Sequence, residues 1–299
     1  MGTIDNYDVV FQRHNKRAGL LNENSSNTGG NTSWGVGALR NSSIYNGDNN
    51  TATGYDALYN NTDANQNTAM GAGALFTQSY SNNNIPWNSD NVAVGFKSLF
   101  TNNPTSILNG IQNTAIGDYS LYSNTTGTSN TANGYDALYS NTTGYRNNAM
   151  GDSSLYNNTI ASRNISVGNQ ALFSNTDADD NVAFGTEALY SQNFNNSGTE
   201  YSTYNVAIGN YSLYNNNPTT GPASNGGNGV NNTAVGYGSL YSNTIGKSNS
   251  AIGFEALAVN NEGNENVAAG YQSLFHNRHA NPYITRLIIM VEQIIILAM

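Results

Sequence analysis

Residues 113–129 read NTAIGDYSLYSNTTGTS, and this seventeen-residue pattern recurs along most of the chain. Its consensus is N-[TV]-A-x-G-Y-x-[AS]-L-[YF]-x-N-T-T-G-x-x, in which positions are numbered from the first Asn. A period of this length is too short for the helix pairs of tetratricopeptide or ankyrin repeats and predicts one coil of a β-solenoid or β-roll. The thirteen copies begin at Asn31, Asn50, Asn67, Asn91, Asn113, Asn130, Asn147, Asn164, Asn181, Asn205, Asn232, Asn249 and Asn266.

Two positions hold the same residue in every copy, and both indicate a structural role. Position 5 is always Gly, which is typical of a corner with positive φ or of a close backbone approach. Position 9 is always Leu, which indicates a packed interior or an interface. The predicted turn glycines are Gly35, Gly54, Gly71, Gly95, Gly117, Gly134, Gly151, Gly168, Gly185, Gly209, Gly236, Gly253 and Gly270. The predicted core or interface leucines are Leu39, Leu58, Leu75, Leu99, Leu121, Leu138, Leu155, Leu172, Leu189, Leu213, Leu240, Leu257 and Leu274.

Position 10 is aromatic in most copies, so stacked coils would carry a nearly continuous row of rings. Such a row could be a packing seam or a platform on which sugars stack, and its place beside the constant Leu favours a seam. We therefore assign its tyrosines to the core or the interface. The row comprises Tyr59, Phe76, Phe100, Tyr122, Tyr139, Tyr156, Phe173, Tyr190, Tyr214, Tyr241 and Phe275.

The coil contains two strand-like pieces, N-T-A-x-G and Y-x-A-L-Y, separated by Gly and by the N-T-T-G corner. One turn of helix is an alternative for the second piece. The Asn residues at positions 1 and 12 would lie about 4.8 Å from their equivalents in neighbouring coils and form amide ladders.

The predicted fold class is all-β, a parallel β-solenoid or β-roll of about thirteen 17-residue coils. Residues 1–30 lack the repeat, and we expect a capping hairpin there, with a linker as the alternative. Residues 31–280 form the array. Residues 281–299 are an apolar segment too short for a membrane helix, and we expect a terminal cap or assembly segment, with a coiled-coil start or a truncated reading frame as alternatives.

Long insertions fall at one place in the repeat, after position 10, which puts them on one edge of the solenoid. They hold four of the five prolines and Trp87, so we interpret them as loops and as the place where loops would recognise a partner. The insertions are residues 77–90, 101–112, 191–204 and 215–231.

The composition excludes several classes of function. The formal net charge is −9, which argues against nucleic-acid binding because phosphate recognition needs a basic surface. Charged residues make up 10% of the chain, against about 25% in an average protein. There is no Cys and hence no disulfide framework. We expect no secretory signal peptide and no membrane span.

No cluster of residues predicts catalysis, a cofactor or a metal. His276 and His279 are spaced like metal ligands but have no evident third ligand, so a surface role is expected. The aspartates of residues 177–180, with Asp63 and Asp90 at related corners, could bind calcium, but solvation of a loop is the simpler interpretation. The serines lack a paired His and Asp, so none is a candidate nucleophile.

The repeat resembles those of known bacterial and viral surface proteins. The residues Asn113–Gly117 followed by Ser120 are similar to the S-V-A-I-G-x-x-[AS] coil of YadA-like trimeric autotransporter heads, and the whole repeat resembles N-T-A-x-G-Y-x-A-L-Y arrays of phage tail-fibre-like proteins. The resemblance implies a left-handed parallel β-roll in a trimer. The chain departs from the adhesin coil in its additional N-T-T-G corner, and no membrane-anchor barrel is evident.

Positions 8 to 10 also predict self-association. A strand sends neighbouring side chains to opposite faces, so the run of Ala or Ser, Leu and Tyr or Phe would place apolar groups on two faces, of which one coil can bury only one. The surplus strip would exceed the few hundred Å² that a soluble monomer normally exposes. We expect a homo-oligomer, either a trimer or a filament built from it.

Together these features predict a non-enzymatic structural protein, a fibre or filament subunit of an extracellular appendage or virus-type tail fibre. Its expected location is extracellular, on a cell surface or on a virion. The alternative is an adhesin that binds surface glycans or receptors through the insertion loops. An ice-binding surface would need an uninterrupted Thr ladder, which the insertions break.

Overall fold

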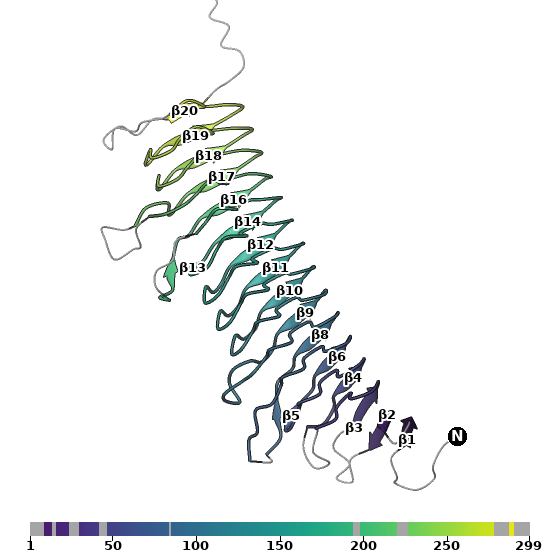
Figure 1. Cartoon of the computed structure of the whole chain (residues 1–299). Helices are drawn as coiled ribbons and strands as arrows, with labels where there is room; N and C mark the ends of the chain where they lie inside the picture. Colours follow the sequence, from purple (N-terminus) through teal and green to yellow (C-terminus); the bar gives the residue numbers. More distant parts are fainter. Residues whose placement is uncertain are drawn as a thin grey trace, which may run out of the picture. The chain divides into compact units, whose positions relative to one another are not determined.

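The computed structural model contains strands and turns and no helix in the parts of the chain that it describes. The chain divides into two compact units, Met1–Ile160 and Ala161–Met299. Figure 1 shows the strands of each unit stacked in chain order. The described residues are 9–13, 16–23, 30–41, 47–83, 85–193, 198–219, 227–277 and 287–289.

The first unit begins with a hairpin and continues as a parallel stack. Strands β1 and β2 are antiparallel, and β2 pairs antiparallel with β3, so the hairpin covers the free edge of the first repeat strand. From β3 onward all pairs in the main sheet are parallel. The strands are β1 (Val9–Arg13), β2 (Lys16–Glu23), β3 (Gly30–Trp34), β4 (Thr51–Thr53), β6 (Thr68–Met70), β8 (Val92–Val94), β9 (Thr114–Ile116), β10 (Thr131–Asn133) and β11 (Asn148–Met150), with β5 (Ala64–Asn65) and β7 (Trp87–Asn88) paired separately.

The second unit is a parallel stack of the same kind. Its last strand, β20, pairs with β19 with Leu287 opposite Val267, so part of the predicted C-terminal segment extends the sheet as a strand and does not begin a coiled coil. The rest of that segment lies outside the described residues. The strands are β12 (Ile165–Val167), β14 (Val182–Phe184), β16 (Val206–Ile208), β17 (Thr233–Val235), β18 (Ser250–Ile252), β19 (Val267–Ala269) and β20 (Leu287–Ile289), with β13 (Ala178–Asp179) and β15 (Tyr201–Ser202) paired separately.

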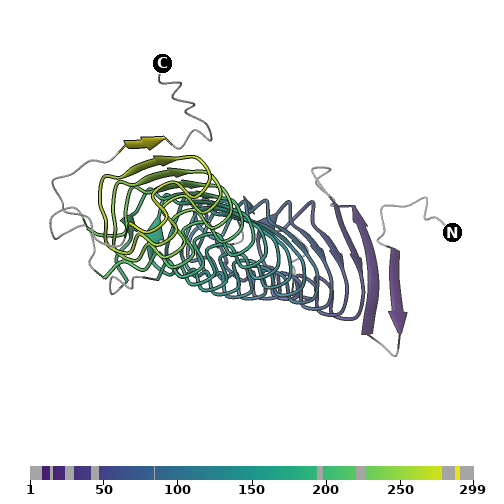
Figure 2. The same ribbon diagram turned by 90° about the horizontal axis from the view of Figure 1, so that it is seen from above.

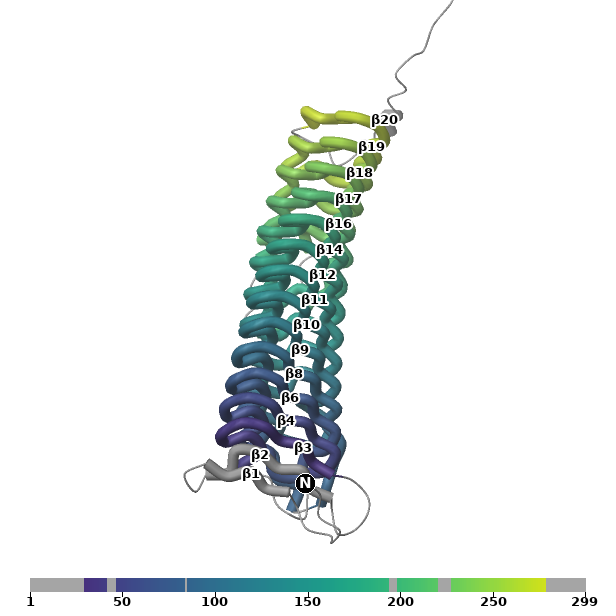
Figure 3. The backbone as a smooth tube through the Cα atoms, turned by 90° about the vertical axis from the view of Figure 1, so that its right-hand side faces the viewer, coloured from purple at the N-terminus to yellow at the C-terminus, as the bar shows by residue number. Residues whose placement is uncertain are grey.

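Equivalent positions of successive repeats pair with one another, which confirms the predicted parallel β-solenoid. Ala132 at position 3, for example, is opposite Ala115 on one side and Ala149 on the other. Seen from above, the coils of each unit lie behind one another as nested loops (Figure 2). The backbone makes one circuit per repeat, as the tube in Figure 3 shows.

The position 5 glycines are required because successive backbones nearly touch at this corner. All thirteen have φ between +118° and +150°, a region open essentially to Gly alone. A Cβ added to Gly134 would overlap the carbonyl oxygen of Gly151 in the next coil. The glycine therefore provides both the backbone conformation and the space.

The predicted second strand at positions 6 to 10 is wrong, and so is the helical alternative. The segment is a series of turns in which Leu at position 9 has φ between +49° and +53° in every coil. The Tyr119 amide at position 7 donates to Phe96 O in the preceding coil, at 2.9 Å, and the Leu121 amide donates to Ala137 O in the following coil, at 2.9 Å. Hydrogen bonds to both neighbours stabilise a conformation that costs a non-glycine residue about 1–2 kcal/mol.

This turn geometry also corrects the argument that two faces receive apolar side chains from positions 8 to 10. The side chains at positions 8 and 9 both face the interior of the coil: Ala137 and Leu138 are fully buried, and twelve of the thirteen leucines are at most 1% exposed. Burying a Leu contributes about 1.5–3 kcal/mol, which offsets the cost of its positive φ. Leu274, in the last repeat, is half-buried.

The predicted amide ladders are present at positions 1 and 12. At position 1, the Asn130 backbone amide donates to Asn113 Oδ1 at 3.1 Å, and Asn130 Nδ2 donates to Gly144 O at 2.8 Å. At position 12, Asn141 Nδ2 donates to Asn124 Oδ1 at 2.8 Å and also to Gly144 O at 3.1 Å. These asparagines are fully buried, so the ladders satisfy polar groups that would otherwise be costly in the interior.

We expect Gly134→Ala to lower the free energy of unfolding by about 3 kcal/mol or more, because both the conformation and the space for a Cβ are unfavourable. Gly198→Ala is the matched control, since Gly198 has φ +78° but nothing within 4 Å of an added Cβ. It should cost about 1 kcal/mol. Urea unfolding followed by circular dichroism measures both, and equal losses would contradict the close-approach argument.

Asn130→Asp should destabilise the protein by about 3 kcal/mol or more, because a carboxylate of the same shape cannot donate to Gly144 O and would place a charge in the interior. The exposed Asn261→Asp is the control and should change the stability by about 0.5 kcal/mol or less. Thermal unfolding at pH 7 tests the pair. A neutral Asn130→Asp variant would show that the ladder is not a source of stability.

Candidate functional site

The position 10 rings form a stack along one edge of each unit. Neighbouring rings lie 5.0–5.3 Å apart between centroids, with interplanar angles of 5–16°. This spacing follows from the distance of about 4.8 Å between adjacent strands. The stacked pairs are Tyr59–Phe76, Phe76–Phe100, Phe100–Tyr122, Tyr122–Tyr139, Tyr139–Tyr156, Phe173–Tyr190, Tyr190–Tyr214 and Tyr214–Tyr241.

Within an uninterrupted run, each ring covers the face of the next, and only ring edges remain for solvent. A sugar that stacks on aromatic side chains needs a free ring face, so the continuous part of this row suits packing better than sugar binding. The environment also disfavours phenolate. Burial, followed by the neighbouring Tyr122 and Tyr156, raises the pKa of Tyr139 above its ordinary value.

A second group of rings lies at positions 6 and 7, beside the first row. In the first unit Phe96 and Tyr119 meet edge to face at 5.3 Å. In the second unit Tyr237, Phe254 and Tyr271 stack in successive coils at 5.3 Å. Four of these rings, Phe96, Tyr237, Phe254 and Tyr271, are 39–62% exposed, whereas Tyr119 and most of the position 10 rings are half-buried. Sequence reasoning did not assign them a role.

The outward face of the repeat strands carries no charge, and in the second unit it is mostly apolar. Position 3 points into the coil, and Ala115 and Ala132 there are fully buried, so positions 2 and 4 point outward. None of the thirteen copies has a charged residue at position 2 or 4. Large apolar side chains at position 4 are 40–58% exposed, and they are Trp34, Met70, Ile116, Met150, Phe184, Ile208 and Ile252.

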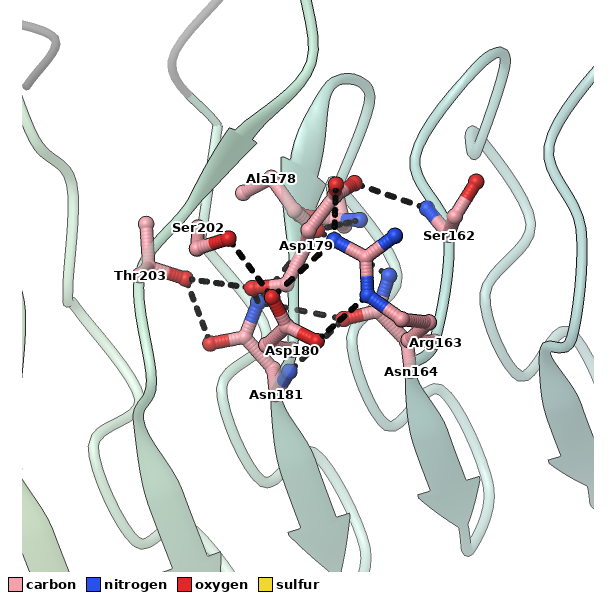
Figure 4. Close-up of polar contacts among 10 residues, drawn as sticks. Ser162, Arg163, Asn164, Ala178, Asp179, Asp180, Asn181, Ser202 and Thr203 are labelled. Atoms are coloured by element: carbon pink, nitrogen blue, oxygen red, sulfur yellow. Dashed lines mark hydrogen bonds and ion pairs between the residues drawn. The ribbon is translucent and has the colours of Figure 1, made fainter.

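The acidic corner at residues 177–180 contains an ion-paired network. The Arg163 guanidinium binds Asp180 through Nε and Nη2, at 2.7 and 3.1 Å, and Nη2 also lies 2.8 Å from Asp179 Oδ2. Figure 4 shows this guanidinium between the two carboxylates. Ser202 Oγ donates to Asp180 and the Ser162 amide donates to Asp179. The cation that pairs with these two carboxylates is thus the guanidinium of Arg163.

The two carboxylates are shifted in opposite directions. Burial raises the pKa of Asp179 to about 6, against the opposing hydrogen bond from the Ser162 amide. The hydrogen bond from Arg163 lowers the pKa of Asp180. Asp179 is nearly inaccessible, with 2% of its side chain exposed, so desolvation dominates there.

The other candidate ligands are also placed by local contacts. Asp63 is buried and accepts hydrogen bonds from Ser81 Oγ at 3.0 Å and from the Asn82 amide at 2.8 Å. His276 is exposed and packs against Phe275, and His279 lies outside the described residues. In the described part of the chain, no three His, Cys, Asp or Glu side chains gather where they could hold a metal ion.

The described parts of two insertions contain strands, which the loop interpretation did not predict. Trp87 belongs to β7, is 5% exposed, and contacts the Tyr80 ring edge-on at 5.8 Å. It is therefore part of an added layer of packing and not an exposed recognition residue. The pairs β5–β7 and β13–β15 show that two insertions stack in parallel on positions 15 and 16 of the coil before them.

No described residue belongs to a helix long and apolar enough to cross a membrane. Comparison with protein-family models, with curated proteins and with solved structures finds no match for this chain.

The opposite pKa shifts at the acidic corner predict opposite pH dependences for two variants. The pKa of Asp179 is higher in the folded state than its ordinary 3.8, so its contribution to stability is complete below about 3.8 and is lost as the pH rises through about 6. The unfolding free energy of the wild type relative to Asp179→Asn should fall by up to about 3 kcal/mol between pH 4 and 7.

Asp180→Asn should show the reverse trend, since the pKa of Asp180 is lowered in the folded state. Its contribution to stability is present above its unfolded pKa and is lost as the pH falls through the folded value. Urea unfolding of the three proteins between pH 3 and 8 measures both differences. A difference for Asp179 that rises with pH would refute the desolvation argument.

Proposed function

We propose that this protein is a structural subunit of a homo-oligomeric fibre or filament, in an extracellular appendage or a virus-type tail fibre. The observation that supports it best is the outward face of the repeat strands, which is uncharged throughout and mostly apolar in the second unit. Parallel sheets in proteins are almost always covered on both faces. Here the inner face is covered by the rest of the coil, and the outer face has no covering segment among the described residues.

The size of this face supports the same proposal. Each coil contributes three strand residues, about 10 Å, and coils repeat every 4.8 Å or so. The six coils of the second unit, where ten of the twelve residues at positions 2 and 4 are apolar, thus present roughly 300 Å², which is comparable to the largest apolar patch of many monomers. The seven coils of the first unit add an uncharged face of mixed character, because eight of its fourteen residues at these positions are Thr or Asn.

The N-terminal edge favours sideways contact over growth from that end. The edge of β3 pairs with β2, and β2 pairs with β1, so the first repeat strand is not free to receive a strand of another copy. A second copy placed on the outward face would instead cover Ile116, Met150 and their equivalents. The proposed assembly is a trimer, or a filament built from it, with this face at the subunit interface.

Ile116→Asp combined with Met150→Asp should dissociate the assembly while the coils stay folded, because two charges would be buried at the interface. Both side chains are 40% or more exposed in the single chain, so the monomer tolerates them. Sedimentation velocity gives the oligomeric state, and circular dichroism reports the fold.

The control is Gln66→Asp combined with Gln112→Asp, which adds the same charge at exposed corner residues outside positions 2 and 4. It should leave the assembly unchanged. The proposal fails if the wild-type chain sediments as a monomer at micromolar concentration, or if both double variants remain assembled.

A further inference from the structure

The aromatic row of the second unit is interrupted once, and the interruption forms a groove. Position 10 is Ala258 in the twelfth coil, between Tyr241 in the coil before and Phe275 in the coil after. The groove has a volume of about 320 Å³, and its lining includes Tyr237, Gly238 and Glu255 as well as these three residues. It lies where a ring would continue the stack.

The spacing of the stack fixes the width of the groove. Tyr214 and Tyr241, one coil apart, have ring centroids 5.1 Å apart. Two coils therefore separate the rings of Tyr241 and Phe275 by about 10 Å, which leaves room for one group about 5 Å from each ring. Tyr241 is 38% exposed, as expected for a ring that has lost the neighbour on one face.

A second small residue deepens the same gap. Position 7 of one coil lies against the position 10 ring of the next coil, since a Cβ on Gly73 would meet the Phe100 ring at 3.3 Å. In the groove, position 7 is Gly238 and the ring that should cover it is replaced by Ala258. A Cβ on Gly238 would touch only Glu255, at 3.4 Å. Both side chains that would fill the space are therefore absent.

The charges around the groove select the kind of ligand. Gln272 Nε2 donates to Glu255 Oε2 at 2.7 Å, which leaves the other carboxylate oxygen without a bond from Gln272. No Lys or Arg lines the groove. Aromatic faces carry negative partial charge and attract cations within about 6 Å of the ring centre. A neutral sugar would gain ring stacking and hydrogen bonds to Glu255, whereas a cation gains in addition an ion pair and the cation–π attraction.

A related gap in the first unit shows what such a space accepts. There Ala72 interrupts the position 6 row between Tyr55 and Phe96, and a groove of about 280 Å³ results. The chain places a cation of its own in the lining of this groove, because Lys97 Nζ lies 5.2 Å from the centre of the Phe96 ring and 5.5 Å from that of Phe100. At Ala258 the chain supplies no such ammonium.

We propose that the groove at Ala258 binds a methylated ammonium group, held between the faces of Tyr241 and Phe275 and paired with Glu255. A trimethylammonium group placed midway would lie about 5 Å from both ring centres, within the range of cation–π attraction. The group can belong to a free small molecule such as choline or to a choline lipid headgroup. This site is independent of the proposed structural role.

The test measures binding of choline to the full chain by calorimetry and by NMR shifts of the tyrosine rings, at low ionic strength. We expect a Kd of about 1 mM or tighter. The neutral isostere 3,3-dimethyl-1-butanol should bind at least about tenfold more weakly, because it keeps the shape and loses the charge. Vesicles of phosphatidylcholine, compared with phosphatidylglycerol, distinguish the sources: sedimentation with phosphatidylcholine alone indicates the lipid headgroup, and binding of free choline alone indicates the small molecule.

Two variants test whether choline binds in the groove at Ala258. Ala258→Phe restores a residue type found at this position in other coils, so it should fold normally and lose choline binding. Glu255→Gln should weaken binding about tenfold while leaving the groove open. Ala171→Ser, at a buried position of another coil, is a control for the effect of substitution itself and should bind as the wild type does.

Three results would overturn the proposal. They are the absence of wild-type binding both to choline at 50 mM or so and to phosphatidylcholine vesicles, equal affinity for choline and its neutral isostere, and unchanged affinity in Glu255→Gln. Binding of neutral monosaccharides in place of choline would assign the groove to sugars and reject the cation. If Ala258→Phe misfolds, the Glu255→Gln variant and the isostere still decide the outcome.

Discussion

The hydrogen bonds that join each coil to the coil before and after it are the constraint on which the rest of this structure depends. They hold equivalent backbones about 4.8 Å apart, so each residue packs mainly against its own counterparts in neighbouring coils. At Gly134 that distance leaves no space for a side chain. At Asn130 it lets one amide bond to the next, and at Tyr139 it brings rings into contact. A sequence repeat is the necessary result, because a residue suitable in one coil must suit its neighbours.

Much of the fold could be predicted because this constraint acts at a fixed period. The constant Gly at position 5 and the Asn residues at positions 1 and 12 predict the corner and the ladders from the sequence alone. The conformation around Leu121 could not be predicted in the same way, because its positive φ depends on contacts with other coils. In this turn the Tyr119 amide donates to Phe96 O of one neighbouring coil, and the Leu121 amide donates to Ala137 O of the other. The local conformational preferences of these residues favour a strand or a helix, and neither would form hydrogen bonds to both neighbouring coils in this way.

The functional surfaces were harder to predict for a related reason. The exposure of the side chains at position 4 could be predicted only if position 3 was known to face inward. The absence of charge at positions 2 and 4 was nevertheless visible in the sequence. The ion pair of Arg163 and Asp180 could also have been predicted from the sequence, since the two residues occupy position 17 of successive repeats. Comparing charges at one repeat position across coils would have found it. The gap at Ala258 was visible as a missing aromatic, but its meaning depends on the spacing of the rings on either side.

The two asparagine ladders have a direction, and this has an electrical consequence. In both ladders the N–H group belongs to the later coil and the carbonyl oxygen to the earlier one, as in the bonds from Asn130 to Asn113 and from Asn141 to Asn124. The amide dipoles therefore add along the axis of a unit and polarise one another, as they do in a helix. The end nearer the N-terminus carries partial positive charge and the other end partial negative charge. A stack built almost entirely from uncharged residues is thus polar along its length, and each of its ends would attract a different kind of ion.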